Sequence, residues 1–206
     1  DNSKEIFYAP NWADYLNKEL EKYQFSKDDK IHFTFAGNIG TVQNLDNVIE
    51  GFGKLGNEFL EKVQLNIVGD GSYLEQLKNI VQEKKFRNIV FWGRKPREEI
   101  FKYLDASDFL IVSLIDKEIF SLTVPAKTQT YIATNKPVIA IINGEASEIV
   151  RENNLGLVCS PSDVEQIKAT FIKAINTTNE EKNEYIRNSE FLTNNVFRKE
   201  IIIDNL

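Results

Sequence analysis

The stretch HFTFAGNIGTVQNLDNVIEGF, from His32 to Phe52, is the most informative part of the chain. An apolar run ends at Gly37, a second glycine follows at Gly40, and Asn44 precedes apolar residues at helical spacing. Asparagine is a favoured helix N-cap, so a helix capped by Asn44 is expected. Strand, glycine turn and helix in this order direct backbone N–H groups at an anion, usually a phosphate. The pattern is not the G-x-G-x-x-G dinucleotide fingerprint, and a tight turn without a ligand has the same residues.

The rest of the chain repeats this alternation of short apolar runs with amphipathic segments. Short runs rich in Ile, Val, Leu and Phe are typical of buried parallel strands. Their alternation with helices predicts an α/β fold, a doubly wound and mostly parallel six-stranded Rossmann-like sheet with helices on both faces. The strands are expected at about 31–36, 64–68, 88–92, 108–113, 137–142 and 156–159, and the helices at about 44–56, 72–85, 97–105, 125–134 and 146–153.

Signals for helix ends support these boundaries. Pro96 and Pro125 stand where helices are expected to start, and Gly156 is expected to stop the helix before it. Ser162 and Glu165 have the spacing of a capping box at the start of a further helix.

The two ends of the chain differ from its centre. Residues 1–30 are polar with scattered aromatics and indicate a connector with a short helix. Residues 162–206 indicate two or three helices, with a polar break from Asn176 to Lys182. The expected organisation is therefore a connector at 1–30, a Rossmann-like domain at 31–176 and C-terminal helices at 177–206.

Composition limits the classes of function. The net charge of −6 argues against a general binder of nucleic acid or membrane surfaces, which is normally basic. Cys159 is the single cysteine, so no internal disulfide can form. No apolar run approaches the roughly 18 residues of a membrane span, and no signal-peptide pattern is present at the N-terminus. The chain starts at Asp1 and has no methionine, which predicts a segment of a longer protein.

Ligands of open α/β sheets bind beyond the carboxyl ends of the strands. Gly69-Asp70-Gly71 is either a tight turn or part of a pocket wall. The Gly93-Arg94-Lys95 segment is either a solvated loop or a contact for a nucleotide. The candidate loops are 37–43, 69–72, 93–96, 114–124 and 143–147.

The segment from Asp116 to Lys127 is a long loop that leads into a helix at Pro125, and loops of this length are often functional. A lysine in the first turn opposes the helix dipole, a cost that disappears if Lys127 meets a phosphate; a solvated lysine is the alternative. His32, the only histidine, stands at a strand start and is expected to be structural. The sequence shows no metal-ligand spacing, nucleophile elbow or Walker motif.

Five blocks in order resemble the C-terminal domain of a GT-B glycosyltransferase of family 4 (group 1), over roughly residues 31–176. The blocks are FAGNIGTVQNLDNVIEGF, LNIVGDGSYLEQLKNIV, IVFWGRKPREEIFKYLDASDFLIVSL, VPAKTQTYIATNKPVIA and GEASEIVRENNLGLVCSPSDVEQI. Within that family, GNIG followed by Gln43, together with P-A-K, is similar to the WbuB-like N-acetylfucosamine transferases of O-antigen and capsule assembly.

The resemblance implies the donor-binding half of a retaining glycosyltransferase of bacterial surface polysaccharide biosynthesis, of hexosyl or N-acetylhexosaminyl type. FYAPNWADYL, residues 7–16, resembles the connector to an acceptor domain that would precede Asp1 and supply the catalytic base. The C-terminal helices would pack back toward that missing domain. The fragment alone is then expected to be inactive.

Position within the family pattern assigns each candidate site residue. The resemblance implies no cofactor and no metal, only a UDP-sugar substrate. The expected diphosphate contacts are Gly37, Asn38, Gly40, Thr123, Val124 and Lys127; the base and ribose contacts are Gly93, Arg94, Lys95, Gln129 and Thr130; the donor-sugar loop contributes Asp116, Glu118, Ser121 and Leu122.

Two departures from the family pattern concern charge. Asn38 and Gln43 stand where many members carry Arg and Lys, so Lys127 is the expected counter-charge of the diphosphate. Leu122 and Thr130 stand where many members carry the Glu-x7-Glu pair, whose second Glu holds the ribose. Ribose recognition by Thr130 or its neighbour Gln129 is therefore left open.

Partners and location follow from the same resemblance. The implied partners are a nucleotide-sugar, the missing acceptor domain and a lipid-linked acceptor, without nucleic acid. The implied location is the cytoplasm, with the full-length protein peripheral at the inner membrane face. A sugar-nucleotide epimerase and a non-catalytic nucleotide-binding or partner-docking module are the alternatives.

Overall fold

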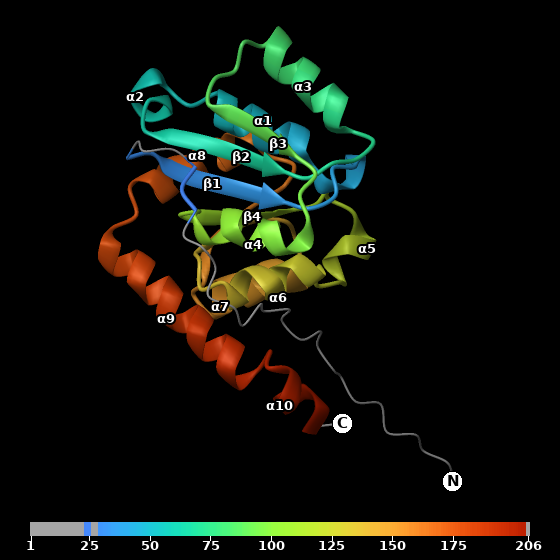
Figure 1. Ribbon diagram of the computed structural model, residues 1–206, viewed down its shortest axis with the longest axis vertical. Helices are drawn as coiled ribbons and strands as arrows, with labels where there is room; N and C mark the ends of the chain where they lie inside the picture. The colour runs from blue at the N-terminus through green and yellow to red at the C-terminus, as the bar shows by residue number, and fades with distance from the viewer. Residues whose placement is uncertain (1–22, 26–28, 205–206) are drawn as a thin grey trace.

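A computed structural model describes residues 23–25 and 29–204 of the chain. Its centre is a six-stranded, wholly parallel sheet in the order β3-β2-β1-β4-β5-β6 (Figure 1). The predicted doubly wound α/β fold is confirmed, and each strand lies within two residues of its expected place. The strands are β1 (Ile31–Ala36), β2 (Val63–Val68), β3 (Ile89–Gly93), β4 (Phe109–Ser113), β5 (Val138–Ile141) and β6 (Gly156–Cys159).

Helices connect the strands and extend the C-terminal end. All five helices expected between strands are present, and three further short elements within those connections were not predicted: α2, α5 and a 3-10 turn at Thr41–Gln43. The helices are α1 (Leu45–Gly53), α2 (Asn57–Leu60), α3 (Leu74–Glu83), α4 (Arg97–Asp105), α5 (Glu118–Ser121), α6 (Ala126–Ala133), α7 (Glu145–Glu152), α8 (Val164–Ile175), α9 (Asn179–Asn195) and α10 (Lys199–Asp204).

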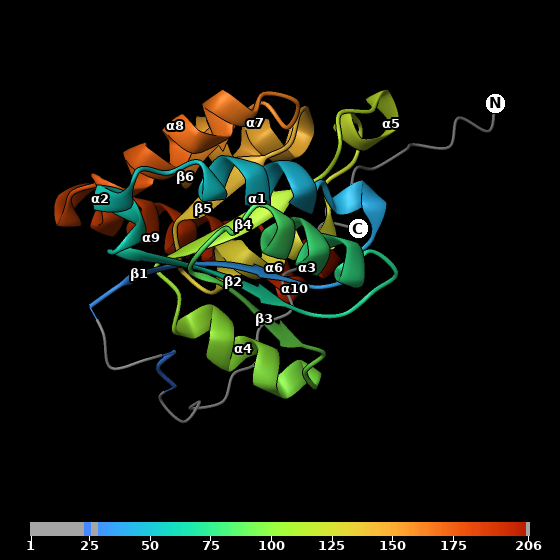
Figure 2. The same cartoon turned by 90° about the horizontal axis from the view of Figure 1, so that it is seen from above.

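Two apolar cores lie on the two faces of the sheet, because the strands of a parallel sheet bury both sides. One core joins β1 and β2 with α1, α3 and α8, and four phenylalanines pack within it. The other joins β4 and β5 with α4, α6 and α7. Figure 2 shows α4 and α8 at opposite sides of the sheet. Both cores contain residues of β1, β2, β4 and β5, so these central strands are covered on both faces, and the strand order reverses direction between β1 and β4.

Three of the predicted helix ends differ in mechanism. Asn44 precedes α1 in a left-handed conformation and caps nothing; its side chain donates to the carbonyl of Pro161 at 2.8 Å. Asp163, not Ser162, caps α8 by accepting from the N–H of Gln166 at 3.0 Å. Left-handed Asn154 (φ 48°) follows α7, whereas Gly156 begins β6, where a Cβ would lie 2.0 Å from the carbonyl oxygen of Val138.

The C-terminal region contains three helices, as expected, although α9 begins at Asn179, inside the predicted polar break. Helix α9 packs against α6 and leads to α10 at the C-terminal end of the molecule (Figure 1). The predicted connector helix at 1–30 lies almost wholly outside the described residues. No helix of the described residues is long and apolar enough to span a membrane.

His32 occupies a structural position, as its place at a strand start predicts. Its ring is buried, stacks on Phe25 with centroids 4.7 Å apart, and lies 3.3 Å from the side-chain amide nitrogen of Asn66. The amide oxygen of Asn66 accepts from the indole N–H of Trp92 at 2.9 Å. These contacts anchor the described part of the connector to the sheet.

Candidate functional site

The carboxyl ends of the strands meet at the edge of the molecule near α5 (Figure 1). The pairing of β1 with β4 ends at Thr34 and Leu110, so the two strands separate before β1 is complete. This separation is the switch point at which open α/β sheets bind their ligands.

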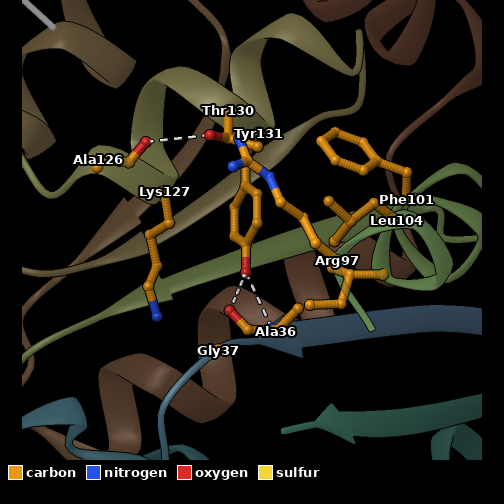
Figure 3. Close-up of a pocket in the computed structure, with 10 residues that line it drawn as sticks. Ala36, Gly37, Arg97, Phe101, Leu104, Ala126, Lys127, Thr130 and Tyr131 are labelled. Atoms are coloured by element: carbon orange, nitrogen blue, oxygen red, sulfur yellow. Dashed lines mark hydrogen bonds between the residues drawn. The ribbon is translucent and has the colours of Figure 1, made fainter. Parts of the chain in front are cut away.

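Tyr131 of α6 closes the unpaired end of β1. Its hydroxyl accepts from the N–H of Ala36 and donates to the carbonyl of the same residue, both at 2.9 Å (Figure 3). Ala36 is two residues beyond Thr34 and presents its backbone groups to the same side, where β4 no longer reaches. Tyr131 is fully buried, and burial raises its pKa above the ordinary range. One side chain thus replaces a strand partner and fixes α6 over the switch point.

The first two glycine loops are in direct backbone contact. Gly69 has a φ of +143°, and a Cβ there would lie 1.9 Å from the carbonyl oxygen of Gly37. A Cβ on Gly71 would lie 2.2 Å from the carbonyl oxygen of Ile39. The Gly69–Gly71 segment is therefore a tight turn that supports the loop after β1, which is the first of its two predicted interpretations.

Three backbone N–H groups of the 37–40 loop already donate hydrogen bonds within the protein. The N–H groups of Gly37 and Ile39 donate to Val68 and Asp70 carbonyls, each at 2.9 Å. Gly40 is buried, and its N–H donates to Oε1 of Gln43 at 2.8 Å. Loop packing and a capping side chain thus occupy these three N–H groups, and diphosphate binding by Gly37 and Gly40 stays a prediction. Asn38, in contrast, is exposed.

Lys127 brings a cation to this neutral loop. Its side chain extends from the first turn of α6 toward Gly37 (Figure 3), and Nζ lies 3.1 Å from the position of a Cβ on that glycine. Nζ also lies 3.9 Å from the ring centroid of Phe35. Removal from water lowers the pKa of Lys127 to about 8. An anionic ligand bound beside a lysine in so apolar a place strongly favours the charged form of that lysine.

A cavity of about 260 Å³ opens between α4 and α6, beside the end of β1. Its floor is mainly apolar and aromatic, and Arg97 and Lys127 contribute cations from α4 and α6 respectively (Figure 3). The residues that line it are Ala36, Gly37, Arg97, Ile100, Phe101, Leu104, Ala126, Lys127, Thr130 and Tyr131.

Only three of the predicted site residues line this cavity: Gly37, Lys127 and Thr130. Gln129 does not, because its side chain is buried and folds back, with its amide oriented to donate to the carbonyls of Pro125 and Ala126 at 3.0 and 3.3 Å. Its part in ribose binding stays a prediction, although its buried side chain does not reach this cavity.

Two of the predicted diphosphate contacts, Thr123 and Val124, lie just before α6. The N–H and hydroxyl of Thr123 both point to the carbonyl of Phe120, at 3.4 and 3.3 Å. Val124 is partly buried and packs on the second core. Neither residue lines the cavity, so their part in diphosphate binding stays a prediction.

The loop after β3 lies beside the cavity, not in its wall. Gly93 accepts from the N–H of Gly69 at 2.9 Å, and Arg94 is exposed. The ammonium of Lys95 lies 5.6 Å from the ring centroid of Tyr103. Arg97 was not predicted as a site residue. It shares one helical face with Phe101 and Leu104, and that i, i+4, i+7 spacing was the available signal.

The predicted donor-sugar loop is partly helical. Oδ1 and Oδ2 of Asp116 accept from Asn143 at 2.8 Å and Ser162 at 3.2 Å, so this carboxylate ties together the loops after β4, β5 and β6. Glu118 and Ser121 form the ends of α5, with the serine hydroxyl donating to the carbonyl of Glu118 at 2.7 Å. Leu122 is 77% exposed.

A family model described as glycosyl transferases group 1 matches residues 17–190, most of the chain. The chain belongs to this family. The predicted family is thereby confirmed at the level of the group, and the group 1 domain includes both glycine loops, α4 and α6.

Curated relatives of this group 1 domain are glycosyltransferases. The "Probable glycosyltransferase WbjE" of Pseudomonas aeruginosa is 27% identical over 176 residues, covering 79% of this chain and 42% of that protein. The "Amylovoran biosynthesis glycosyltransferase AmsK" of Erwinia amylovora is 27% identical over 112 residues, covering 53% of this chain and 28% of that protein. The chain thus spans less than half the length of the curated relatives it matches.

Solved structures share the fold of this group 1 domain. Anabaena HepE in complex with UDP and glucose superimposes with a TM-score of 0.71 at 16% identity, over 86% of this chain and 47% of that one. WaaG, a glycosyltransferase involved in lipopolysaccharide biosynthesis, gives a TM-score of 0.70 at 15% identity, over 87% and 46%. At these identities the likeness concerns the fold.

Proposed function

We propose that this chain is the donor-binding half of a retaining glycosyltransferase of surface polysaccharide biosynthesis, with a UDP-sugar as donor. The observation that carries the proposal is the placement of Lys127 against Gly37 at the switch point, beside a cavity with an apolar floor. An apolar floor suits a nucleoside, and a desolvated cation suits its diphosphate. The crystal structure of HepE with UDP and glucose and the role of AmsK in amylovoran biosynthesis support this choice.

The proposed chemistry is electrostatic. As the bond between sugar and diphosphate breaks, negative charge grows on the leaving phosphate, and a preorganised cation beside it stabilises the transition state. Lys127 has this role in the proposal, without a metal or other cofactor. The acceptor and the catalytic base belong to the half of the protein that would precede this chain, so the chain alone binds donor and transfers no sugar.

The narrower assignment is also part of the proposal. The GNIG and P-A-K segments resemble the WbuB-like N-acetylfucosamine transferases, which favours an N-acetylhexosaminyl donor. A lipid-linked acceptor at the inner membrane face fits such a pathway. The epimerase alternative requires acidic groups near the sugar, for which Asp116 and Glu118 are available, and both oxygens of Asp116 are engaged with Asn143 and Ser162. Product analysis with UDP-N-acetylhexosamine and no acceptor separates the two enzymes.

Calorimetric titration of the 206-residue chain with UDP and with uridine tests the proposal. We expect UDP to bind, and Lys127→Ala to weaken UDP roughly 30-fold, about 2 kcal/mol, since a charge-assisted contact is lost. Uridine, which lacks the diphosphate, is expected to lose less than about threefold.

The matched control is Lys62→Ala, which removes an exposed lysine at the opposite edge of the sheet, just before β2. It should leave both affinities unchanged. Absence of UDP binding at millimolar concentration contradicts the proposed function, and equal losses for UDP and uridine remove Lys127 from the diphosphate.

A further inference from the structure

Lys127 has no anionic partner among the residues that the structure describes. Several other lysines pair with carboxylates; Lys78, for example, lies 2.7 Å from a carboxylate oxygen of Glu75. Lys127 forms no ion pair and no side-chain hydrogen bond with a described residue, and its ammonium instead lies 3.9 Å from the ring centroid of Phe35. The face of a phenyl ring attracts an ammonium only weakly compared with a carboxylate. The charged form of Lys127 is therefore poorly supported in the free protein.

The cavity beside this amine also lacks a negative charge. Apart from Lys127, the titratable residues among the ten that line it are Arg97 from α4 and Tyr131 from α6. Arginine stays cationic, and burial raises the pKa of Tyr131, so its hydroxyl stays neutral. Burial lowers the pKa of Lys127 to about 8. At pH 7.5, about a quarter of this lysine is then the unprotonated amine, compared with about one thousandth of an ordinary lysine.

The same cavity has room for a small acyl group. Its volume is about 260 Å³, and Ala36, Phe101 and Leu104 give it apolar walls. Figure 3 shows the Lys127 side chain reaching past Tyr131 toward Gly37. An unprotonated lysine in an apolar pocket is a nucleophile. Acylation would turn it into an uncharged amide, which suits these surroundings better than an ammonium does.

We propose that Lys127 is a covalent acylation site, modified by small acyl phosphates that enter the cavity between α4 and α6. The unprotonated Nζ attacks the carbonyl carbon of the acyl phosphate and forms a C–N bond. The C–O bond to the phosphate breaks, the phosphate leaves with the bonding electron pair, and one proton of the amine passes to solvent. The product is an amide without the positive charge beside Gly37. The effect of this change on UDP binding rests on the proposed function, whereas the modification itself does not.

Peptide mass spectrometry after incubation of the 206-residue chain with acetyl phosphate at pH 7.5 tests the proposal. We expect Lys127 to be acetylated at least about fivefold faster than Lys62, an exposed lysine just before β2, because more of it is unprotonated. The rate at Lys127 should level off above about pH 8, whereas the rate at Lys62 continues to rise. A smaller ratio of rates, or parallel pH profiles at the two lysines, overturns the proposal.

A carboxylate placed next to Lys127 provides a second test. Thr130→Glu introduces one on the cavity wall, three residues farther along α6, where side chains at i and i+3 are neighbours. The carboxylate favours the ammonium, so acetylation of Lys127 should slow at least about fivefold. Thr170→Glu, at a hydroxyl on α8 that donates to the carbonyl of Gln166, is the control and should keep the wild-type rate. An unchanged rate in Thr130→Glu contradicts the proposal.

Competition with UDP separates this proposal from the proposed function. If the diphosphate contacts Lys127, saturating UDP should slow acetylation of that lysine at least about tenfold and leave Lys62 unaffected. Rapid acetylation of Lys127 that UDP does not slow contradicts the proposed function and supports the acylation site. Slow acetylation of Lys127 without UDP, in a chain that still binds UDP, overturns the acylation site and leaves the proposed function standing.

Discussion

At the scale of the residue, Lys127 lies in surroundings that oppose its own charge. Its pKa, lowered to about 8 by burial, means that the free protein loses the proton as pH rises from 7 to 9. A diphosphate binds the charged form and restores the ordinary high pKa, so binding takes up a proton in this range. We therefore expect the affinity for UDP to fall about tenfold between pH 7 and pH 9, measured by calorimetry.

The same measurement on Lys127→Ala should give an affinity that is weak and nearly independent of pH. Lys62→Ala keeps Lys127 and should keep the tenfold fall. A wild-type affinity that changes less than twofold over this range contradicts the assigned role of Lys127.

At the scale of the element, one hydroxyl joins α6 to β1. Tyr131→Phe leaves the buried N–H and carbonyl of Ala36 without partners, at a cost of about 2 to 3 kcal/mol in the free energy of unfolding. Urea denaturation measures this loss. Tyr73→Phe, at a partly exposed ring, is the control and should stay within about 0.5 kcal/mol of the wild type. A similarly small effect at Tyr131 would show that β1 and α6 do not depend on this contact.

At the scale of the whole molecule, Tyr23 and Phe25 attach the segment before β1 to the face that carries α4. Phe25 lies 4.7 Å from the ring centroid of His32 and 5.7 Å from those of Trp92 and Tyr103. Tyr23 packs on Tyr103 at 4.9 Å. The connector thus reaches the sheet through aromatic contacts that span residues of β1, β3 and α4.

Trp92 reports this attachment once Trp12, the other tryptophan, is replaced by Phe. In that background, Phe25→Ala is expected to shift the emission of Trp92 to longer wavelength and to lower stability by about 2 kcal/mol, because the indole loses its cover. Phe191→Ala, at a ring of α9 that is 67% exposed, is the control and should change neither. Unchanged emission after Phe25→Ala means that the connector does not cover Trp92.

Much of the fold was predictable because its signals are local. Buried parallel strands require continuous apolar runs, and α1 and α6 show helical spacing next to Gly or Pro, so their places were predicted within a few residues. Short elements such as α5 escaped prediction because four residues carry too little periodicity. The predicted capping box at Ser162 is wrong because Ser and Asp are both good N-cap residues, and in the folded chain Asp163 lies at the cap position of α8.

The features of the site also divide into those that the sequence predicts and those that only the folded structure brings together. The amino-acid sequence by itself determined the doubly wound order of elements, the glycine turns and a lysine in the first turn of α6, since each depends on residues close together in the chain. Only the tertiary structure decided that Gln129 is buried and that Arg97 joins Lys127 around one cavity. Burial and shared walls depend on contacts between elements distant in sequence, and no local pattern contains them.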